Sequence, residues 1–232
     1  AARGVPRVQW LMRELVAHGD AQVSLSRLQR AVSAFDEVQP LEMREIWCVP
    51  QALRIELCAV FAAVSRRALE AGRERVAAEQ WVGAGADVRS LGAHVKSCTF
   101  CERALQLMHE QEMPDARRAL EHRLEEVSTG AEGVIRLAHE QQALDRLWLT
   151  NIMNALRMLE AADWQECFDQ LSRTHAALMQ DPTGLYPRMD EASRELIRRQ
   201  VAYIARRAGL NELTVAQCAV RAAKEDLARE DL

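Results

Sequence analysis

The sequence predicts an all-α fold, an irregular bundle of about eight to ten helices without a sheet. Three observations support this class. Ala, Leu, Arg and Glu dominate the 232 residues, and their side chains lose little entropy in a helix. Aromatic residues make up 5% of the chain, too few for a core built from sheets. Apolar residues recur at helical spacing, but no repeat with a period of about 30–45 residues is present, which disfavours a regular solenoid.

Prolines and one capping residue define the helices expected in the N-terminal part. Pro6 opens the first, where its missing N–H costs nothing, and Ser24 caps the second. Pro40 ends that helix, because proline cannot continue it and restricts the residue before it. A short helix over residues 41–48 then leads to Pro50, which we expect in the first turn of a long helix.

Glycines mark the breaks expected in the middle of the chain. Gly83 and Gly85 end the long helix. Pro114 begins another helix, and Gly130 and Gly133 separate it from the next one.

Capping and turn residues define the C-terminal helices. Asp163 is expected to cap a helix, with Glu166 as the reciprocal partner of a capping box. Residues 181–184 have the composition of a turn. Asp190 then starts a helix that Gly209 ends.

The length of the chain suits one generous hydrophobic core. No linker rich in Gly, Ser or Pro divides it. We therefore predict a single all-α domain over residues 1–232, in which residues 83–87 are the weakest point for a subdivision.

The charge pattern disfavours nucleic acid as a partner. The chain carries 30 basic and 34 acidic residues, a net charge of −4, without the concentrated positive potential that phosphates require. Arginine pairs such as Arg198-Arg199 lie beside carboxylates, and we interpret them as solvated helix faces. The longest apolar run, residues 57–64, is too short to span a membrane. Six cysteines without a secretory segment predict free thiols, so we expect this fragment to be soluble and cytosolic.

One cluster has metal-like spacing. Cys98 and Cys101, with His94 four residues before them, can share a helix face and supply three zinc ligands. A closed structural site needs a fourth ligand, for which His109 and His122 are the candidates. Because no second Cys-x-x-Cys pair is present, helical periodicity alone explains the two thiols, and we expect no metal.

No group of residues predicts catalysis. The sequence has neither a glycine-rich phosphate loop nor an Asp-x-Asp pair for a metal-bound diphosphate, and we expect no cofactor. His175 and the other histidines stand singly on predicted helices. Four of the five tryptophans fall on apolar stripes, whereas Trp81 lies in a polar stretch and is the candidate for an exposed ligand contact.

Two proline-containing joints between helices are the most distinctive features of the sequence. Each combines a turn with an aromatic residue and charged residues, a pattern far rarer than helical periodicity. The joint residues are Gln39, Pro40, Trp47 and Pro50 in the first, and Asp181, Pro182, Gly184, Tyr186 and Asp190 in the second.

These joints resemble the N-terminal helical region of the cyclic β-1,2-glucan synthases, large membrane glycosyltransferases that polymerise glucose. The likeness covers nearly the whole chain in order. It departs at Glu42-Met43-Arg44, where the family usually has a Thr-x-Gly step, and at Glu191, which replaces a common aromatic residue. The other matching segments are Arg13–Asp20, Asn151–Arg157 with Asp163-Trp164, and Ala205–Leu210.

The resemblance implies a non-catalytic piece of a longer hexosyltransferase. In such synthases this region precedes membrane helices and a domain that uses UDP-glucose, and none of the catalytic residues can be carried onto this chain. The expected role is a scaffold, regulatory or docking module on the cytoplasmic side of the inner membrane. Its expected partners are the downstream glycosyltransferase and membrane domains of the same polypeptide. The alternative is a glucan-binding module that presents exposed aromatics such as Trp81 to a β-glucan.

Overall fold

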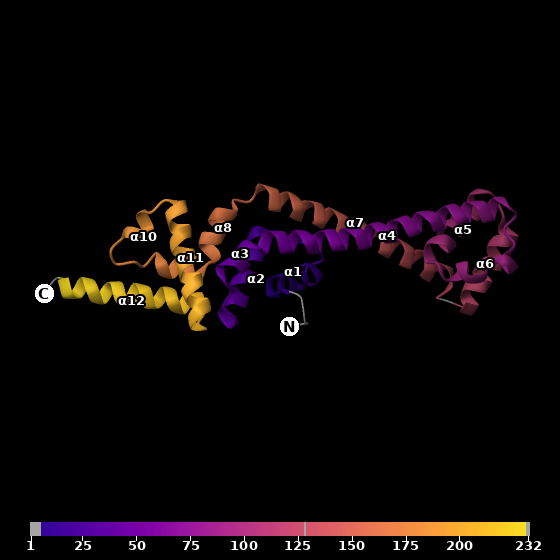
Figure 1. Ribbon diagram of the computed structural model, residues 1–232. Helices are drawn as coiled ribbons and strands as arrows, with labels where there is room; N and C mark the ends of the chain where they lie inside the picture. The colour runs from indigo at the N-terminus through magenta and orange to yellow at the C-terminus, as the bar shows by residue number, and fades with distance from the viewer. Residues whose placement is uncertain (1–5, 128, 231–232) are drawn as a thin grey trace. The chain divides into compact units, whose positions relative to one another are not determined.

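The computed structural model describes residues 6–127 and 129–230 (Figure 1). Within these ranges the chain forms twelve α-helices, nine of them with seven or more residues, and no strand. The prediction of an all-α fold without a sheet is therefore confirmed. No helix in the described ranges is both long and apolar enough to cross a membrane.

The chain divides into two compact units, each described here by itself. Unit 1 combines Ala1–Leu57 with Ile152–Leu232, and unit 2 is Cys58–Asn151. The two boundaries therefore fall inside the long helices α4 (Val49–Gly83) and α7 (Gly130–Ala161), away from residues 83–87. The single domain over residues 1–232 stays a prediction.

Unit 1 contains the short and medium helices that precede α4 and follow α7 in the sequence, together with parts of these two long helices. Fully buried residues from both chain segments, such as Leu28, Leu53, Ile152 and Phe168, form its core. Helix α9 packs against α12, and α3 and α2 pack against α8. Its remaining helices are α1 (Arg7–Ala17), α2 (Leu25–Val38), α3 (Met43–Trp47), α8 (Trp164–Leu171), α9 (Arg173–Leu178), α10 (Leu185–Arg188), α11 (Glu191–Ala208) and α12 (Glu212–Glu230).

Unit 2 has its own hydrophobic core. Phe100, Met108, Leu120 and Leu124 are fully buried in it, and Trp81 packs against the same cluster. Besides parts of α4 and α7, it contains α5 (Cys98–Glu110) and α6 (Pro114–Val127), which pack against each other, and two 3-10 turns, η1 (Val88–Ser90) and η2 (Gly92–Lys96).

Most of the helix boundaries follow the local signals. The Ser24 side chain accepts a hydrogen bond from the N–H of Arg27 at the start of α2, which ends at Val38 before Pro40. Pro50 lies in the first turn of α4, which ends at Gly83. These predictions are confirmed. Helix boundaries of this kind can be predicted because proline, glycine and capping residues act within one turn of their own position.

Two local predictions differ from the structure. Gly133 does not separate helices but lies inside α7, which begins at Gly130. Asp163 caps α8 as predicted, by accepting hydrogen bonds from the N–H groups of the next turn, but the Glu166 carboxylate accepts from Gln170. Gly133 and Glu166 can both lie inside a helix, so each predicts a helix boundary or cap less strongly than a proline predicts a helix end.

Candidate functional site

The first joint is built from carboxylates that accept backbone hydrogen bonds. Gln39 ends α2 in an extended conformation, and the N–H of Leu41 donates to Asp36 Oδ1 at 2.5 Å across Pro40. Burial raises the pKa of Asp36, although this hydrogen bond and the Arg173 charge oppose the shift. The joint thus places a buried carboxylate where the chain reverses.

Contacts with Arg7 and with Glu212 hold helix α3 in place. Glu42 and Glu45 form a capping box at its start, and the guanidinium of Arg7 pairs with Glu45. The N–H of Met43 donates to Glu212 Oε2 at 2.7 Å, which ties α3 to the first turn of α12. Burial raises the pKa of Glu212, against the effect of that hydrogen bond.

The second joint is organised by one carboxylate. Asp181 accepts hydrogen bonds from the N–H groups of Thr183, Leu185 and Tyr186 at 3.0 to 3.1 Å. Burial alone would raise the pKa of Asp181, but the hydrogen bonds outweigh it and lower the pKa. Gly184 adopts the left-handed conformation, with φ of +66°, which few residues other than glycine adopt readily. Pro182 lies within this turn.

Helix α11 begins directly after this turn. The Asp190 side chain accepts from the N–H of Ser193 at 2.8 Å, so Asp190 caps α11 as predicted. The hydrogen bond lowers the pKa of Asp190. Arg194, one turn further on, donates to the carbonyl of Pro187 at 2.6 Å and thereby holds the turn against the helix.

A row of rings joins the two joints inside unit 1. Trp47 stacks on Phe168 with ring centroids 4.5 Å apart and an interplanar angle of 16°. The ring centroids of Phe168 and His175 are 6.3 Å apart, and His175 Nδ1 lies 3.1 Å from the hydroxyl oxygen of Tyr186. Trp47 of the first joint and Tyr186 of the second are therefore linked through the buried side chains of Phe168 and His175. Neither of these two was predicted to be a joint residue.

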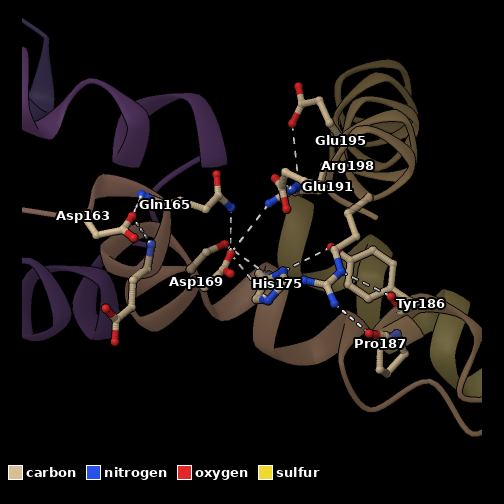
Figure 2. A network of polar contacts seen from close by, with 12 residues as sticks. Asp163, Gln165, Asp169, His175, Tyr186, Pro187, Glu191, Glu195 and Arg198 are labelled. Carbon is tan, nitrogen blue, oxygen red and sulfur yellow. Dashed lines mark hydrogen bonds and ion pairs between the residues drawn. The ribbon is translucent and has the colours of Figure 1, made fainter. Parts of the chain in front are cut away.

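Arg198 is the charged centre of this region (Figure 2). Its side chain is only 2% exposed and lies over the Phe168 ring, 5.0 Å from the centroid. Carboxylates surround the guanidinium: Glu191 pairs with it, Glu195 lies at 3.5 Å and Asp169 at 3.9 Å. Its Nε and Nη1 atoms have no hydrogen-bond partner within the described residues. The interpretation of Arg198 as part of a solvated face is therefore wrong.

His175 is buried beside this charge. Burial lowers the pKa of His175, and the Arg198 and Arg194 charges act in the same direction, while Asp169 opposes them. The neutral imidazole is therefore favoured, which suits a side chain that exchanges a hydrogen bond with Tyr186.

Of the metal-like cluster of unit 2, only Cys101 belongs to the core. Cys101 is buried, its Sγ lies 3.6 Å from the carbonyl oxygen of His94, and burial raises the pKa of Cys101 to about 12. His94 stacks on Phe100 with centroids 4.9 Å apart and pairs with Glu74. Among the described residues, no three His, Cys, Asp or Glu side chains are arranged to hold a metal ion.

The remaining candidate ligands lie elsewhere in unit 2. Cys98 is half-buried at the start of α5. His109 lines a pocket of about 370 Å³ together with His139, and His122 pairs with Glu126.

Trp81 is half-buried and already makes several contacts. Its indole packs against Phe100, with ring centroids 5.7 Å apart. Its N–H lies 3.3 Å from the carbonyl oxygen of Asp87 and 3.2 Å from Ser90 Oγ. Trp47, by contrast, is 38% exposed. A larger fraction of Trp47 than of Trp81, the residue expected to contact a ligand, is therefore exposed.

No protein-family model matches the chain. A curated relative is the cyclic beta-(1,2)-glucan synthase NdvB of Rhizobium meliloti (strain 1021), which is 24% identical over 233 residues. The chain is distantly homologous to a region of this synthase. The alignment covers 95% of the chain but only 8% of the length of the relative. The resemblance read from the joints is thereby confirmed at the level of sequence similarity.

Proposed function

We propose that this chain is a non-catalytic helical domain of a cyclic β-1,2-glucan synthase-like glycosyltransferase and that it acts as a docking scaffold. The similarity to NdvB along 95% of the chain is the observation that carries this proposal. The two joints support it, because rings and carboxylates fix them to each other within unit 1. A module that must hold another domain in place benefits from such rigidity.

The docking surface we propose is the exposed apolar face of α11. Leu196, Tyr203 and Ile204 are 62%, 52% and 49% exposed, and their spacing places them on one side of the helix, with the exposed Gln200 and Arg207 between them. An exposed apolar face of this kind typically marks a protein interface. The occupant we propose is the glycosyltransferase part of the same polypeptide, since the chain spans about 8% of the length of its relative.

The proposed place of the domain follows from this occupant. We propose that the glycosyltransferase part works on the cytoplasmic side of the inner membrane, anchored there by membrane domains of the same polypeptide. We propose that the helical domain lies there too, with those membrane domains as further partners.

A binding measurement tests the docking proposal. The chain is titrated against the separately purified glycosyltransferase region of the longer protein. We expect the double variant Leu196→Lys/Ile204→Lys to weaken binding by about tenfold or more, because two charges would enter an apolar interface. The control is Val38→Lys, which introduces a lysine at a strongly exposed apolar residue of α2 in the same unit but outside the proposed surface. Equal binding by the double variant and the wild type would contradict the proposal.

An activity measurement tests the non-catalytic part of the proposal. The purified chain is incubated with UDP-glucose carrying a radioactive glucose, and we expect no label in oligosaccharide. Transfer of glucose by the chain alone, reproduced with material purified by a second route, would refute this role.

The second candidate function is a glucan-binding module. The exposed indole of Trp47 favours it, because carbohydrate sites use aromatic rings as platforms and Trp81 has its N–H engaged within unit 2. Calorimetric titration of the chain with a β-1,2-glucan tests it, and absence of saturable binding at millimolar sugar would contradict it.

A further inference from the structure

Three adjoining pockets of unit 1 meet around α3 and α11. The first, of about 440 Å³, and the second, of about 160 Å³, share Arg44, Arg206 and Glu212. The second shares Trp47, Glu195 and Arg199 with a third, open pocket of about 430 Å³. We call the hollow defined by these six residues the Trp47 groove. The first and third pockets have volumes in the range of small-ligand sites, and the smaller second pocket connects them.

Trp47 provides the groove with an apolar platform. One face of the indole is covered by the nearly parallel ring of Phe168. The exposed 38% of the residue therefore belongs to the opposite face and the ring edge, and the residue lines two of the three pockets. A ring held from behind is a rigid surface on which a flat ligand can stack without further ordering cost.

The polar lining of the groove contains both signs of charge. Arg44, Arg199 and Arg206 lie beside Glu195 and Glu212. Arg206 is exposed and makes no hydrogen bond or ion pair within the part of the chain that the structure describes. Its donors are thus available to a ligand, whereas those of Arg199 are shared with Glu195 at 2.9 Å.

This lining favours a neutral ligand with many hydroxyl groups over an anion. A hydroxyl donates to a carboxylate and accepts from a guanidinium, so it matches a groove with both groups. A phosphate or polyanion would meet Glu195 and Glu212 as well as the arginines, so the lining offers it no uniformly positive surface. The buried cation of Arg198 does not change this balance, because Glu191, Glu195 and Asp169 surround it.

We propose that the Trp47 groove binds a neutral saccharide of glucose-configured rings. The equatorial hydroxyls of such a ring leave axial C–H groups on its faces, which stack on the indole of Trp47. Its hydroxyls accept from Arg206 and donate to Glu195. This inference rests on the second candidate function, and it gives that function a site, a ligand class and roles for named residues.

Isothermal titration calorimetry with β-1,2-, β-1,3- and β-1,4-linked glucotetraoses tests the site. We expect saturable millimolar binding of at least one tetraose, and a loss of about tenfold in affinity in Arg206→Ala. This variant removes an exposed side chain without a partner, so the fold is preserved. The matched control is Arg30→Ala, an exposed arginine of α2 outside the groove, which is expected to bind like the wild type.

Two further variants test the platform. Trp47→Ala is expected to abolish binding and Trp47→Phe to retain part of it, because a smaller ring still stacks on Phe168. Urea unfolding of both variants separates lost binding from lost folding, and Arg206→Ala decides the matter if Trp47→Ala unfolds.

Each remaining outcome is decisive. Tetraose binding that Arg206→Ala and Trp47→Phe leave unchanged would overturn the site while leaving glucan binding by the chain intact. Absence of saturable binding of every tetraose would overturn both. Binding of inorganic pyrophosphate, weakened by Arg206→Ala and unaccompanied by sugar binding, would show that the groove takes anions and overturn the ligand class.

Discussion

Arg198 shows how unit 1 accommodates a charge in its interior. Burying a guanidinium is costly unless opposite charges compensate it, and here three carboxylates do so from its rim. Those carboxylates are 30% to 45% exposed, so they keep part of their hydration while they neutralise the arginine. The stacking of the guanidinium on Phe168 adds an attraction that a lysine ammonium would reproduce less well.

We therefore expect Arg198→Lys to lower the free energy of unfolding by about 2–3 kcal/mol, because the planar, multiply paired group is lost while a buried charge remains. Arg199→Lys, at the exposed neighbouring residue, should change it by less than about 0.5 kcal/mol. Urea unfolding followed by circular dichroism measures both. Equal effects of the two variants would show that the buried position has no special role.

His175 gives unit 1 a pH dependence of known sign. Its folded pKa is below the ordinary value of 6.5, mainly through burial, so between the two values the unfolded chain binds more protons. The contribution of His175 to stability is therefore fully present above pH 6.5 and is lost as the pH falls through this window. The buried carboxyls of Asp36 and Glu212 have raised pKa values and act in the opposite sense, losing stability as the pH rises.

The comparison of the wild type with His175→Gln isolates this effect. We expect the difference in free energy of unfolding between the two proteins to shrink as the pH is lowered from about 7.5 to 5. Urea titrations at a series of pH values measure it. A difference that stays constant over this range would mean that His175 does not titrate differently in the folded state.

At the scale of elements, the ends of helices depend on single residues with special backbone angles. Gly209 ends α11 at a φ of +68°, and nothing lies within 4 Å of the position that a Cβ would take. Gly72 lies inside α4, likewise with free space around it and without a positive φ. The two glycines differ in backbone conformation rather than in surroundings.

The same substitution should therefore have opposite effects at the two sites. Gly209→Ala is expected to cost about 1 kcal/mol, because alanine is strained in the left-handed region. Gly72→Ala is expected to stabilise by about 0.5–1 kcal/mol through the lower entropy of the unfolded chain. Thermal unfolding of both variants tests the pair, and a loss of stability in each would contradict the explanation.

The joints show what local sequence can predict and where it fails. Pro40, Asp190 and Gly209 act on their own turn, so the helix ends they set were readable from the sequence. The stacking of Trp47 on Phe168 and the burial of Arg198 depend on residues more than 100 positions apart or on the packing of several helices. The helical spacing of Trp164, Phe168 and Leu171 predicts that Phe168 faces inward, but it does not indicate that an arginine lies over the same ring.

The residues of the proposed groove could not be recognised from the sequence for a similar reason. Arg206 belongs to an arginine pair that looks like any solvated helix face, and Trp47 lies in a joint that predicted only a structural role. Their convergence results from the packing of α3 near α11 and α12. Because Trp47 falls on an apolar stripe, the sequence alone does not indicate that its ring is partly exposed.

At the scale of the whole molecule, two cores lie in one chain. The core of unit 2 is centred on Phe100, and Phe168 is its counterpart in unit 1. Each is fully buried, and truncating a phenylalanine of this kind typically costs about 3–5 kcal/mol.

Phe100→Ala should therefore increase amide hydrogen exchange mainly in Cys58–Asn151, and Phe168→Ala mainly in the other unit. Hydrogen exchange measured by mass spectrometry distinguishes the two patterns. Uniform acceleration across the chain in both variants would instead support the single cooperative domain that the sequence predicts.

The order of the chain has a consequence for its synthesis. Unit 1 needs both Ala1–Leu57 and Ile152–Leu232, and the ribosome makes all of unit 2 between them. At about 5–20 residues per second, that interval lasts roughly 5–20 s. For this time the apolar side chains of the first nascent segment lack the residues that later cover them. We therefore expect nascent copies to bind chaperones that shield apolar segments during translation.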